Sequence, residues 1–465
     1  MDVDAADANM HHYQTPQQQH EAQRLQNIEK MKFLKQWNHR LLIVLLHLMG
    51  YAAVTRSALA TAETMSTMFT GLGAAEHACE FLRAGGTHPD INLPIKLVPI
   101  LACDANELSQ QLASARPPVA GVNPVVVGNM MEFFAVPFWR HDWRWQEKFA
   151  MLLNAPMNMH VLDIRTNRQV RVPSALVDFS GSPCVDHSTS NAHCRGGSAG
   201  RHNHLFLAWS VYHIRQGTAI IFHENVGGFD CDWAIAVLGA WYVLQVILVH
   251  PEHAGYNMVN RPRQVIVGVR KGVAQITRDM QAVYDVASSA LATNLTISTM
   301  YIADAMEVMQ EEIEESTARC IVPRFRGDLS YCLHATMRKY ISRFDYQYWQ
   351  GFCRLPHTDV DLIYNLQDNP SARLTWSATS RRLPTMRRDS RRLWIPSRAR
   401  WLSFKERLSG MGFAAYIELA NAAGVKQFPA DFCRTKPHQM MLGDSMHVGA
   451  MGVVLGVALA CIEIL

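Results

Sequence analysis

The sequence lacks any Cys-x-x-Cys pair, although it contains ten cysteines among its 465 residues. Zinc ribbons and small disulfide scaffolds place their cysteines at short, regular intervals, so neither class fits this chain. Thiols that stay reduced are typical of proteins inside cells. We therefore expect an intracellular protein.

Charge is also scarce. Charged residues make up 18% of the chain, apolar residues 49%, and the formal net charge is +4. These values predict a folded globular protein and do not by themselves indicate a polyanionic partner. One stretch differs, because residues 373–400 contain nine arginines and a single acid, Asp389. Such a stretch could bind phosphate groups or could simply be a solvated surface.

No apolar run has the length and flanks expected of a secretory signal or a clear membrane span. The run Leu41–Met49 is short, and Val448–Leu465 is interrupted by three glycines and Glu463. Both runs predict helices of a protein core, and we expect no membrane role.

Short apolar runs alternate with helix-like segments between residues 60 and 272. The runs are Met65–Phe69, Leu97–Cys103, Pro124–Gly128, Ala175–Phe179, Ala219–His223 and Gln264–Val269. Continuous apolar runs suit strands that are buried on both faces, and their alternation with helices predicts a doubly wound parallel α/β sheet. Pro99 weakens the second strand, because proline cannot donate a hydrogen bond to a neighbouring strand.

The chain divides into four parts by composition. Residues 1–35 are polar and begin with a Gln/His-rich segment, which predicts a disordered tail. The α/β domain is expected over residues 36–272 and a smaller lobe over residues 273–380. Residues 381–465 look α/β-like again and are expected to return to the first domain.

Small and polar residues follow the first three predicted strands. The sequence Phe-Thr-Gly-Leu-Gly, with Phe69, Gly71 and Gly73, follows the first, Asp104 the second and Asn129 the third. Open α/β sheets bind ligands at this edge, where glycines allow close approach, an acid can hold ribose hydroxyls and an amide can bond an adenine edge. Each residue also fits an ordinary turn or cap, but together they outline a nucleoside pocket.

Reactive residues follow the later strands. Cys184 lies on a Gly-Ser-Pro turn after the fourth strand, Glu224 follows the fifth, and Arg261 and Arg263 precede the sixth. Most cysteines are buried structural residues, but a proline-containing turn at a strand end favours an accessible nucleophile. The two arginines share a face if their segment is extended.

The order FxGxG, acid, Pro-Cys, Glu-Asn-Val and Arg-x-Arg resembles the motif series of the cytosine-C5 DNA methyltransferase family. Residues 385–413 are similar to that family's R-x-L-(T/S)-x-x-E…GF segment, and residues 443–452 to its final Gly-Asn motif. The resemblance covers residues 65–272 and 383–465. It implies a Rossmann-like methyltransferase domain with a target-recognition lobe over residues 273–380.

The resemblance also implies a reaction, in which a methyl group passes from S-adenosylmethionine to C5 of a cytosine flipped out of double-stranded DNA. Phe69, Gly71 and Gly73 would cradle the cofactor, while Asp104 would hold its ribose and Asn129 its adenine.

The same resemblance assigns the catalytic roles. Cys184 would attack C6 of cytosine, and Glu224 would contact N3 and the exocyclic amine. Arg263, with Arg261 near it, would orient the base oxygen and the thiolate. Because C5 is too electron-poor to accept a methyl group unaided, addition of a thiolate at C6 is what activates it.

Several positions depart from the family pattern. Asp104 stands for a more usual Glu, Asn129 for Asp, Val259 for Gln, Ala414 for Pro and Asp444 for Asn. These changes concern cofactor affinity and the junction between lobes. They leave the nucleophile, the glutamate and both arginines in place.

Two alternatives remain beside a stand-alone, monomeric DNA enzyme. One is a cytosine-C5 methyltransferase that acts on tRNA with the same scaffold, and the other is a non-catalytic relative that binds cofactor or partner proteins. Non-catalytic relatives usually lose the Pro-Cys or Glu-Asn-Val residues, which this chain keeps. No metal is expected, because no common site has the spacing of Asp186, His187, His193, Cys194, His202 and His204.

Overall fold

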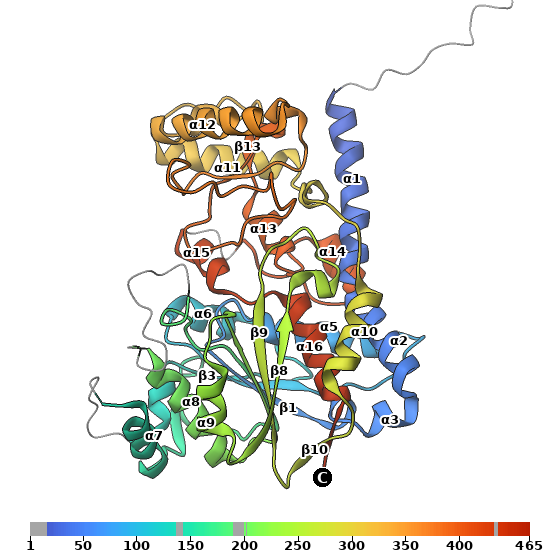
Figure 1. The fold of residues 1–465 in the computed structure, drawn as a ribbon, viewed down its shortest axis with the longest axis vertical. Coiled ribbons are helices and arrows are strands. Elements are labelled where there is room, and N and C mark those ends of the chain that lie inside the picture. The colour runs from blue at the N-terminus through green and yellow to red at the C-terminus, as the bar shows by residue number, and fades with distance from the viewer. Residues whose placement is uncertain (1–15, 136–142, 189–199, 201, 432–435) are drawn as a thin grey trace, which may run out of the picture.

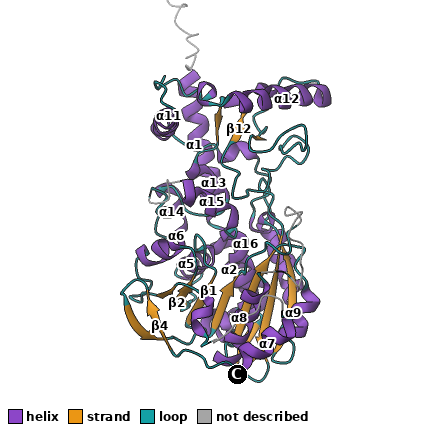
Figure 2. Cartoon of the chain, turned by 90° about the vertical axis from the view of Figure 1, so that its left-hand side faces the viewer, coloured by secondary structure: helices purple, strands orange, loops and turns teal. Residues whose placement is uncertain are grey.

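The computed structural model describes residues 16–135, 143–188, 200, 202–431 and 436–465. A large α/β body forms the lower part of the molecule in Figure 1, and a smaller lobe lies above it. The rotated view of Figure 2 shows the strands of the body side by side with helices on both of their faces.

A seven-stranded sheet forms the centre of the body, in the order β3-β2-β1-β6-β7-β9-β8. Its strands are β1 Thr64–Met68, β2 Val98–Cys103, β3 Val125–Val127, β6 Val177–Ser180, β7 Ile220–Asn225, β8 Tyr242–Val249 and β9 Arg263–Arg270. The first five are parallel, whereas β9 runs antiparallel to both of its neighbours. The predicted doubly wound, Rossmann-like fold is confirmed by this order, in which the chain starts at the centre and proceeds first to one edge and then to the other.

Helices cover both faces of the sheet because successive strand residues point to opposite sides. One face packs against α2 Trp37–Met49, α5 Ala74–Gly86, α10 Met280–Leu291 and α16 Val448–Ala460. The other packs against α7 Trp145–Asn154, α8 Asn203–Gln216 and α9 Cys231–Leu238. In β7, for example, Phe222 belongs to the first core and Ile221 to the second.

All six apolar runs form strands, including the one that contains Pro99. Pro99 lies opposite Met65, and the register of β1 and β2 shifts next to this pair. The irregularity is where a residue without an N–H can be tolerated. The sequence did not lead us to expect strand β8 or the hairpin of β4 His160–Asp163 and β5 Arg168–Arg171.

The smaller lobe contains α11 Ala305–Ala318, α12 Ala335–Phe352 and a three-stranded sheet of β11 Tyr364–Asn365, β12 Leu393–Ile395 and β13 Arg400–Trp401. Its bounds differ from those expected. Residues 280–291 form α10, which packs on α2 and α16 of the body. At the other end, β12 pairs with β11 and β13 pairs with β12, so the chain does not return to the body at residue 381. Trp394 and Trp401 belong to the lobe's own core, while Leu393 and Ile395 join the core of the body. Strand β12 therefore contributes side chains to both cores, Trp394 to that of the lobe and Leu393 and Ile395 to that of the body.

The prediction of a disordered tail over residues 1–35 is wrong from residue 16 onward, because α1 spans Pro16–Lys35. Residues 1–15 lie outside the described residues. Ile28, Met31 and Leu34 recur at helical spacing and are buried. The helix packs on α14 Ile417–Ala423, and Asn27 donates a 2.8 Å hydrogen bond to the carbonyl of Ser298. A polar composition masked this apolar stripe.

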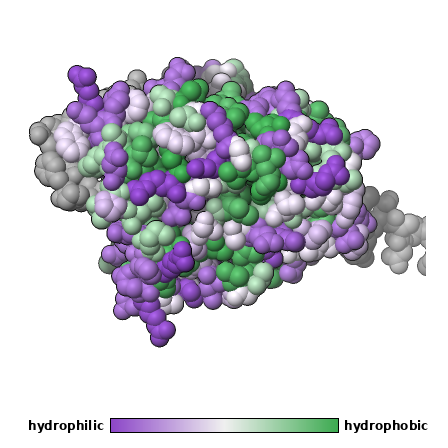
Figure 3. All heavy atoms as spheres, turned by 90° about the horizontal axis from the view of Figure 1, so that it is seen from below, coloured by the Kyte–Doolittle hydropathy of each residue, from purple (hydrophilic) through white to green (hydrophobic). Residues whose placement is uncertain are grey.

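The remaining elements connect these parts and close the body. They are α3 Tyr51–Arg56, α4 Ala58–Thr61, α6 Glu107–Ala115, α13 Phe404–Gly410, α15 Lys436–Asp444, β10 Ala274–Ile276 and β14 Ile462–Ile464. One helical stretch, Gln439–Ala460, is long and apolar enough to cross a membrane, but 89% of its apolar window is buried inside the protein. Hydrophobic and hydrophilic residues are mixed over the face seen from below (Figure 3).

Candidate active site

The glycine-containing turn lies between β1 and α5. Phe69, Gly71 and Gly73 have φ angles of 59°, 53° and 75°, which fall in the left-handed region. The N–H of Gly71 donates to Asp104 Oδ2 at 2.8 Å, and the N–H of Phe69 donates to the carbonyl of Cys103 at 2.6 Å. A side chain at Gly71 would meet nothing within 4 Å, so the space beside this turn is open. The first predicted ligand turn is therefore rigid and accessible.

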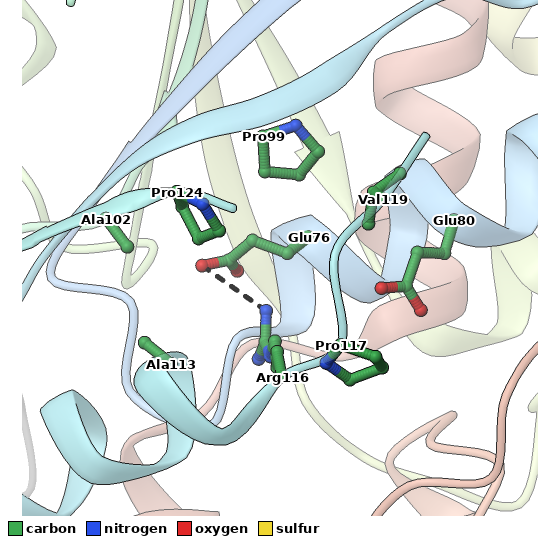
Figure 4. A pocket seen from close by; sticks show the side chains of 9 residues that line it. All are labelled: Glu76, Glu80, Pro99, Ala102, Ala113, Arg116, Pro117, Val119 and Pro124. Atoms are coloured by element: carbon green, nitrogen blue, oxygen red, sulfur yellow. Dashed lines mark ion pairs between the residues drawn. The ribbon is translucent and has the colours of Figure 1, made fainter. Parts of the chain in front are cut away.

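Arg116 supports the same turn from within the protein. Its Nη2 donates to the carbonyl of Leu72 at 2.8 Å, and a Cβ at Gly73 would lie only 1.3 Å from that nitrogen. Its Nη1 lies 3.5 Å from the buried carboxylate of Glu76, and this ion pair lines a pocket of about 340 Å³ between α5, α6 and the sheet (Figure 4). Arg116 was missed because it ends a helix 43 residues after Gly73 and belongs to no motif.

Asp104 and Asn129 lie at the ends of β2 and β3, as expected. Asp104 Oδ1 accepts the N–H of Asn106 at 2.8 Å, and burial raises the pKa of Asp104. Asn129 Oδ1 accepts the N–H of Met131 at 2.9 Å and so caps the short 3-10 helix Met130–Phe133. The side chain of Ser109 also bonds to Asp104, while Asn129 Oδ1 keeps a second lone pair for a donor on a ligand. A glycine turn with open space beside it and a carboxylate at the next strand end fits the ribose and methionine parts of S-adenosylmethionine.

The turn that carries Cys184 is held from the neighbouring strand β7. Ser182 Oγ lies 2.9 Å from His223 Nε2, and Asn225 Nδ2 donates to the carbonyl of Ser182 at 3.2 Å. Burial lowers the pKa of His223 to about 3, so its ring is neutral at physiological pH. After the cysteine, the N–H groups of His187 and Ser188 both donate to the carbonyl of Cys184, which closes a helical turn.

Gly181 brings this turn close to Glu224. A Cβ at Gly181 would lie 2.6 Å from Met446 Cε and 3.0 Å from Glu224 Oε2, so a side chain there would displace Met446 and crowd the carboxylate. Arg263 Nε lies 2.9 Å from Glu224 Oε1, yet this buried oxygen forms no hydrogen bond with any residue that the structure describes. The arginine compensates the charge of the carboxylate while leaving its hydrogen-bonding capacity for another group.

The thiol of Cys184 is surrounded by charges of both signs. Burial and the carboxylate of Glu224 raise its pKa, while Arg263 and Arg261 act in the opposite direction. The thiol is therefore protonated at neutral pH in the free protein. The structure thus brings together the four residues that the sequence predicted for catalysis, although they come from three separate segments.

Arg261 makes structural contacts in addition to its place near the thiol. It is 3% exposed and donates to the carbonyls of Met386 and Gly443 at 3.1 and 3.0 Å. Burial lowers its pKa to about 9. Arg261 therefore ties the catalytic edge to the arginine-rich stretch and to α15. The residues that sequence reasoning missed here are Ser182 and His223, although His223 directly precedes the predicted Glu-Asn-Val motif.

The arginine-rich stretch is largely occupied by internal ion pairs. Six of its nine arginines have acidic partners: Arg381–Asp359, Arg382–Glu252, Arg387–Asp368, Arg388–Asp444, Arg392–Glu315 and Arg400–Glu406. The pair between Arg400 and Glu406 is fully buried and bidentate, at 2.7 and 2.8 Å. Ser403 and Glu406 also form a capping box at the start of α13. Much of this charge therefore stabilises the fold.

The group of histidines, Cys194 and Asp186 whose spacing matches no common zinc site is only partly described. The N–H of His202 donates to Asp186 Oδ2 at 2.6 Å, and His187 Nε2 lies 3.1 Å from Asn203 Oδ1. His193 and Cys194 lie outside the described residues. The described members are engaged with protein partners.

Comparison with known proteins gives structural matches only. No protein-family model and no curated protein sequence matches this chain. Solved structures that are similar include a protein described as a DNA modification methyltransferase from a prophage (E. coli), with 13% identity, 85% of this chain and 98% of that chain covered, and a TM-score of 0.44. The methyltransferase EhMeth of Entamoeba histolytica is 12% identical, with 86% of this chain and 98% of that chain covered and a TM-score of 0.42. Dnmt2 of S. pombe is 12% identical, with 85% of this chain and 98% of that chain covered and a TM-score of 0.44. The fold assignment above rests on the strand order of this chain itself.

Proposed function

We propose that this protein is an S-adenosylmethionine-dependent cytosine-C5 methyltransferase that acts on double-stranded DNA. The observation that supports this most directly is the grouping of Cys184 with Glu224, Arg263 and Arg261 at the edge of the sheet that also carries the glycine turn. A nucleophile, a carboxylate with an unused oxygen and two cations are the groups that addition to cytosine requires. The protein acts as a monomer inside the cell, in the nucleus if the source is eukaryotic.

The first step is addition of sulfur to C6 of a cytosine that has been flipped out of the duplex. Because Cys184 is protonated in the free protein, its proton must leave as the S–C6 bond forms. Arg263 and Arg261 stabilise the developing thiolate, and N3 of the base takes up a proton, so the charge on the ring stays low. Glu224 lies where it can relay that proton to N3 and accept a hydrogen bond from the exocyclic amine.

The adduct then reacts at C5. The cofactor supplies an electrophilic methyl group, and the electron pair released at C5 forms the new carbon–carbon bond. The C5 proton leaves to water, the S–C6 bond breaks, and the proton on N3 returns to the sulfur. One proton is released overall. Asp104 would hold the ribose of the cofactor, and the open space beside Gly71 would admit the rest of it.

Trapping with a fluorinated substrate tests this mechanism. Fluorine at C5 cannot leave as a proton, so duplex DNA in which 5-fluorocytosine replaces cytosine should form a complex with the protein that survives denaturation. The complex should need S-adenosylmethionine and should be absent with Cys184→Ser. Cys231→Ser is a matched control, because Cys231 is also a partly buried free cysteine whose pKa is raised by burial.

The result separates the parts of the proposal. Trapping by Cys184→Ser, or its loss in Cys231→Ser, would show that the nucleophile is misassigned. A parallel reaction with tRNA that contains 5-fluorocytidine should give no complex. Trapping of the tRNA alone would keep the mechanism and overturn the substrate.

A further inference from the structure

A cluster of two histidines and an aspartate shares no residue with the proposed active site. His39 is on α2, and His88 and Asp90 are in the turn that follows α5. One side-chain nitrogen or oxygen from each of the three residues lies within 4.8 Å of the other two. The imidazole rings of His39 and His88 have centroids 3.9 Å apart. Two segments separated by about 50 residues therefore bring metal-ligating atoms together.

A second observation concerns the ring of His39, whose side chain is partly buried. His39 Nε2 is shielded from solvent and has no hydrogen-bond partner among the described residues. A buried ring nitrogen without a partner is costly, because it has lost its bond to water and gained nothing in exchange. A cation bound by its lone pair would remove this cost.

We propose that His39, His88 and Asp90 bind one Zn²⁺ ion. Zinc accepts imidazole nitrogen and carboxylate oxygen in a tetrahedral arrangement, and a water molecule would complete the set. The side chains of His88 and Asp90 are 44% and 72% exposed, so they can turn towards an ion without displacing core residues. The hydrogen bond that His88 Nδ1 accepts from the N–H of Asp90 is long, at 3.3 Å, and little is lost if it opens.

The ion would connect the N-terminal helices to the α/β body. Two hydrogen bonds already join the same regions, from Asn38 Nδ2 to the carbonyl of Phe81 at 2.5 Å and from Tyr51 Oη to the carbonyl of Asn92 at 3.0 Å. Zinc at this place is a structural link with no part in methyl transfer. Because binding to the folded state alone stabilises that state, zinc should raise the unfolding temperature.

The test is titration of the metal-free full-length chain with ZnCl₂ by calorimetry. It is done in a chain with His11→Ala and His12→Ala, because this adjacent pair near the N-terminus could bind zinc independently. We expect one equivalent of Zn²⁺ at micromolar concentrations and a higher unfolding midpoint in its presence. His88→Ala should abolish both effects, and Asp90→Asn should weaken binding by about tenfold or more.

His357→Ala, which removes an exposed histidine of the smaller lobe, is the matched control and should bind zinc as the parent does. Absence of zinc binding by the parent would overturn the proposal, and so would binding by His88→Ala with unchanged affinity. Circular dichroism tests whether the variants are folded. We expect the spectrum of the parent for both, since neither His88→Ala nor Asp90→Asn alters a buried core residue. The outcome is independent of whether the protein methylates DNA.

Discussion

The turn around Cys184 and the stretch of residues 373–400 differ in how their polar groups are used. At the turn, Glu224 pairs with Arg263, but its buried Oε1 has no hydrogen-bond partner among the described residues, and the thiol lies among charges of both signs. In the arginine-rich stretch, six of nine arginines have acidic partners within the protein. Groups with unmet bonding capacity are suited to a ligand, whereas paired groups are suited to holding a fold. The density of a residue type along the sequence does not distinguish the two cases.

The largest effect is expected where the arginine-rich stretch is most deeply buried. Arg400→Met leaves the carboxylate of Glu406 buried without its partner, which should lower the free energy of unfolding by about 3–5 kcal/mol. Urea denaturation measures this loss. Arg381→Met is the control, because Arg381 is 54% exposed and its ion pairs should contribute no more than about 1 kcal/mol. Equal losses for the two variants would contradict the structural role of the buried pair.

A comparable effect, on rate rather than stability, is expected at the catalytic edge. Glu224→Gln keeps the shape of the side chain but removes the charge and the ability to carry a proton. We expect kcat for methyl transfer to fall by about 10²–10³-fold. The substitution also breaks the largely buried ion pair with Arg263, so urea denaturation should show a loss of stability, and kcat is compared between folded proteins. A variant that loses stability but retains kcat would place Glu224 among the structural residues instead.

The stability of the contact between α11 of the smaller lobe and α13 should depend on pH. Burial raises the pKa of Glu307 and of Glu311 to about 7, and the carboxylates of Glu307 and Glu406 repel each other. An acid whose pKa is raised in the folded state binds more protons there than in the unfolded chain. Stability is therefore present below the folded pKa and is lost as the pH rises from about 4.3 through 7, by up to about 1.4 kcal/mol per pH unit for each group.

Urea denaturation between pH 5 and pH 8 measures this dependence. Glu311→Gln should make the unfolding free energy less dependent on pH over that interval, whereas Glu314→Gln, which changes an exposed residue of the same helix, should leave the dependence as it is. An unchanged slope in Glu311→Gln would show that Glu311 does not titrate in this range.

Arg116 provides a milder test of the catalytic edge. Arg116→Met removes the hydrogen bond to the carbonyl of Leu72, which should loosen the glycine turn and weaken binding of S-adenosylmethionine by about tenfold. At saturating cofactor, kcat should be close to that of the parent. Arg116→Lys should restore part of the affinity, because the ammonium group can reach the same region. Calorimetry with the cofactor decides the matter, and equal affinities for all three proteins would contradict it.

The smallest effect concerns contacts with DNA from the arginine-rich stretch. Arg373 and Arg388 are exposed, and the pair of Arg388 with Asp444 is open to solvent on both sides. If each contacts a phosphate, Arg373→Gln and Arg388→Gln should each reduce the salt dependence of DNA binding by about 0.9 log units. Arg392→Gln should not, because Arg392 is committed to Glu315 and lies over the ring of Trp401. Equal slopes for all variants would leave the stretch without a role in DNA binding.

Apolar runs were enough to predict six of the seven strands of the sheet, because a strand buried on both faces needs an uninterrupted series of apolar residues. The positions of Asp104, Cys184 and Glu224 followed from the rule that ligands bind beyond the ends of parallel strands. The contacts that hold these residues did not follow. His223 contacts Ser182, and Arg116 contacts Leu72, only because the fold brings these distant residues together. No motif or regular spacing in the sequence indicates either contact. Residues 16–35 were misjudged because three buried apolar residues are a weak signal within a polar sequence.

Helix α16 has a consequence for how the protein is made. All 13 of its residues are buried, and a Cβ at Gly452 would lie 1.9 Å from Trp37, so this helix fits tightly between elements that precede it by several hundred residues. During synthesis, β1, α2 and α5 leave the ribosome long before the helix that covers them. Until α16 is synthesised, their apolar surfaces stay exposed to solvent, and such exposure favours association with chaperones or with other nascent chains. Folding of the body should accordingly be completed only after α16 has emerged, and a chain that stops before it should aggregate.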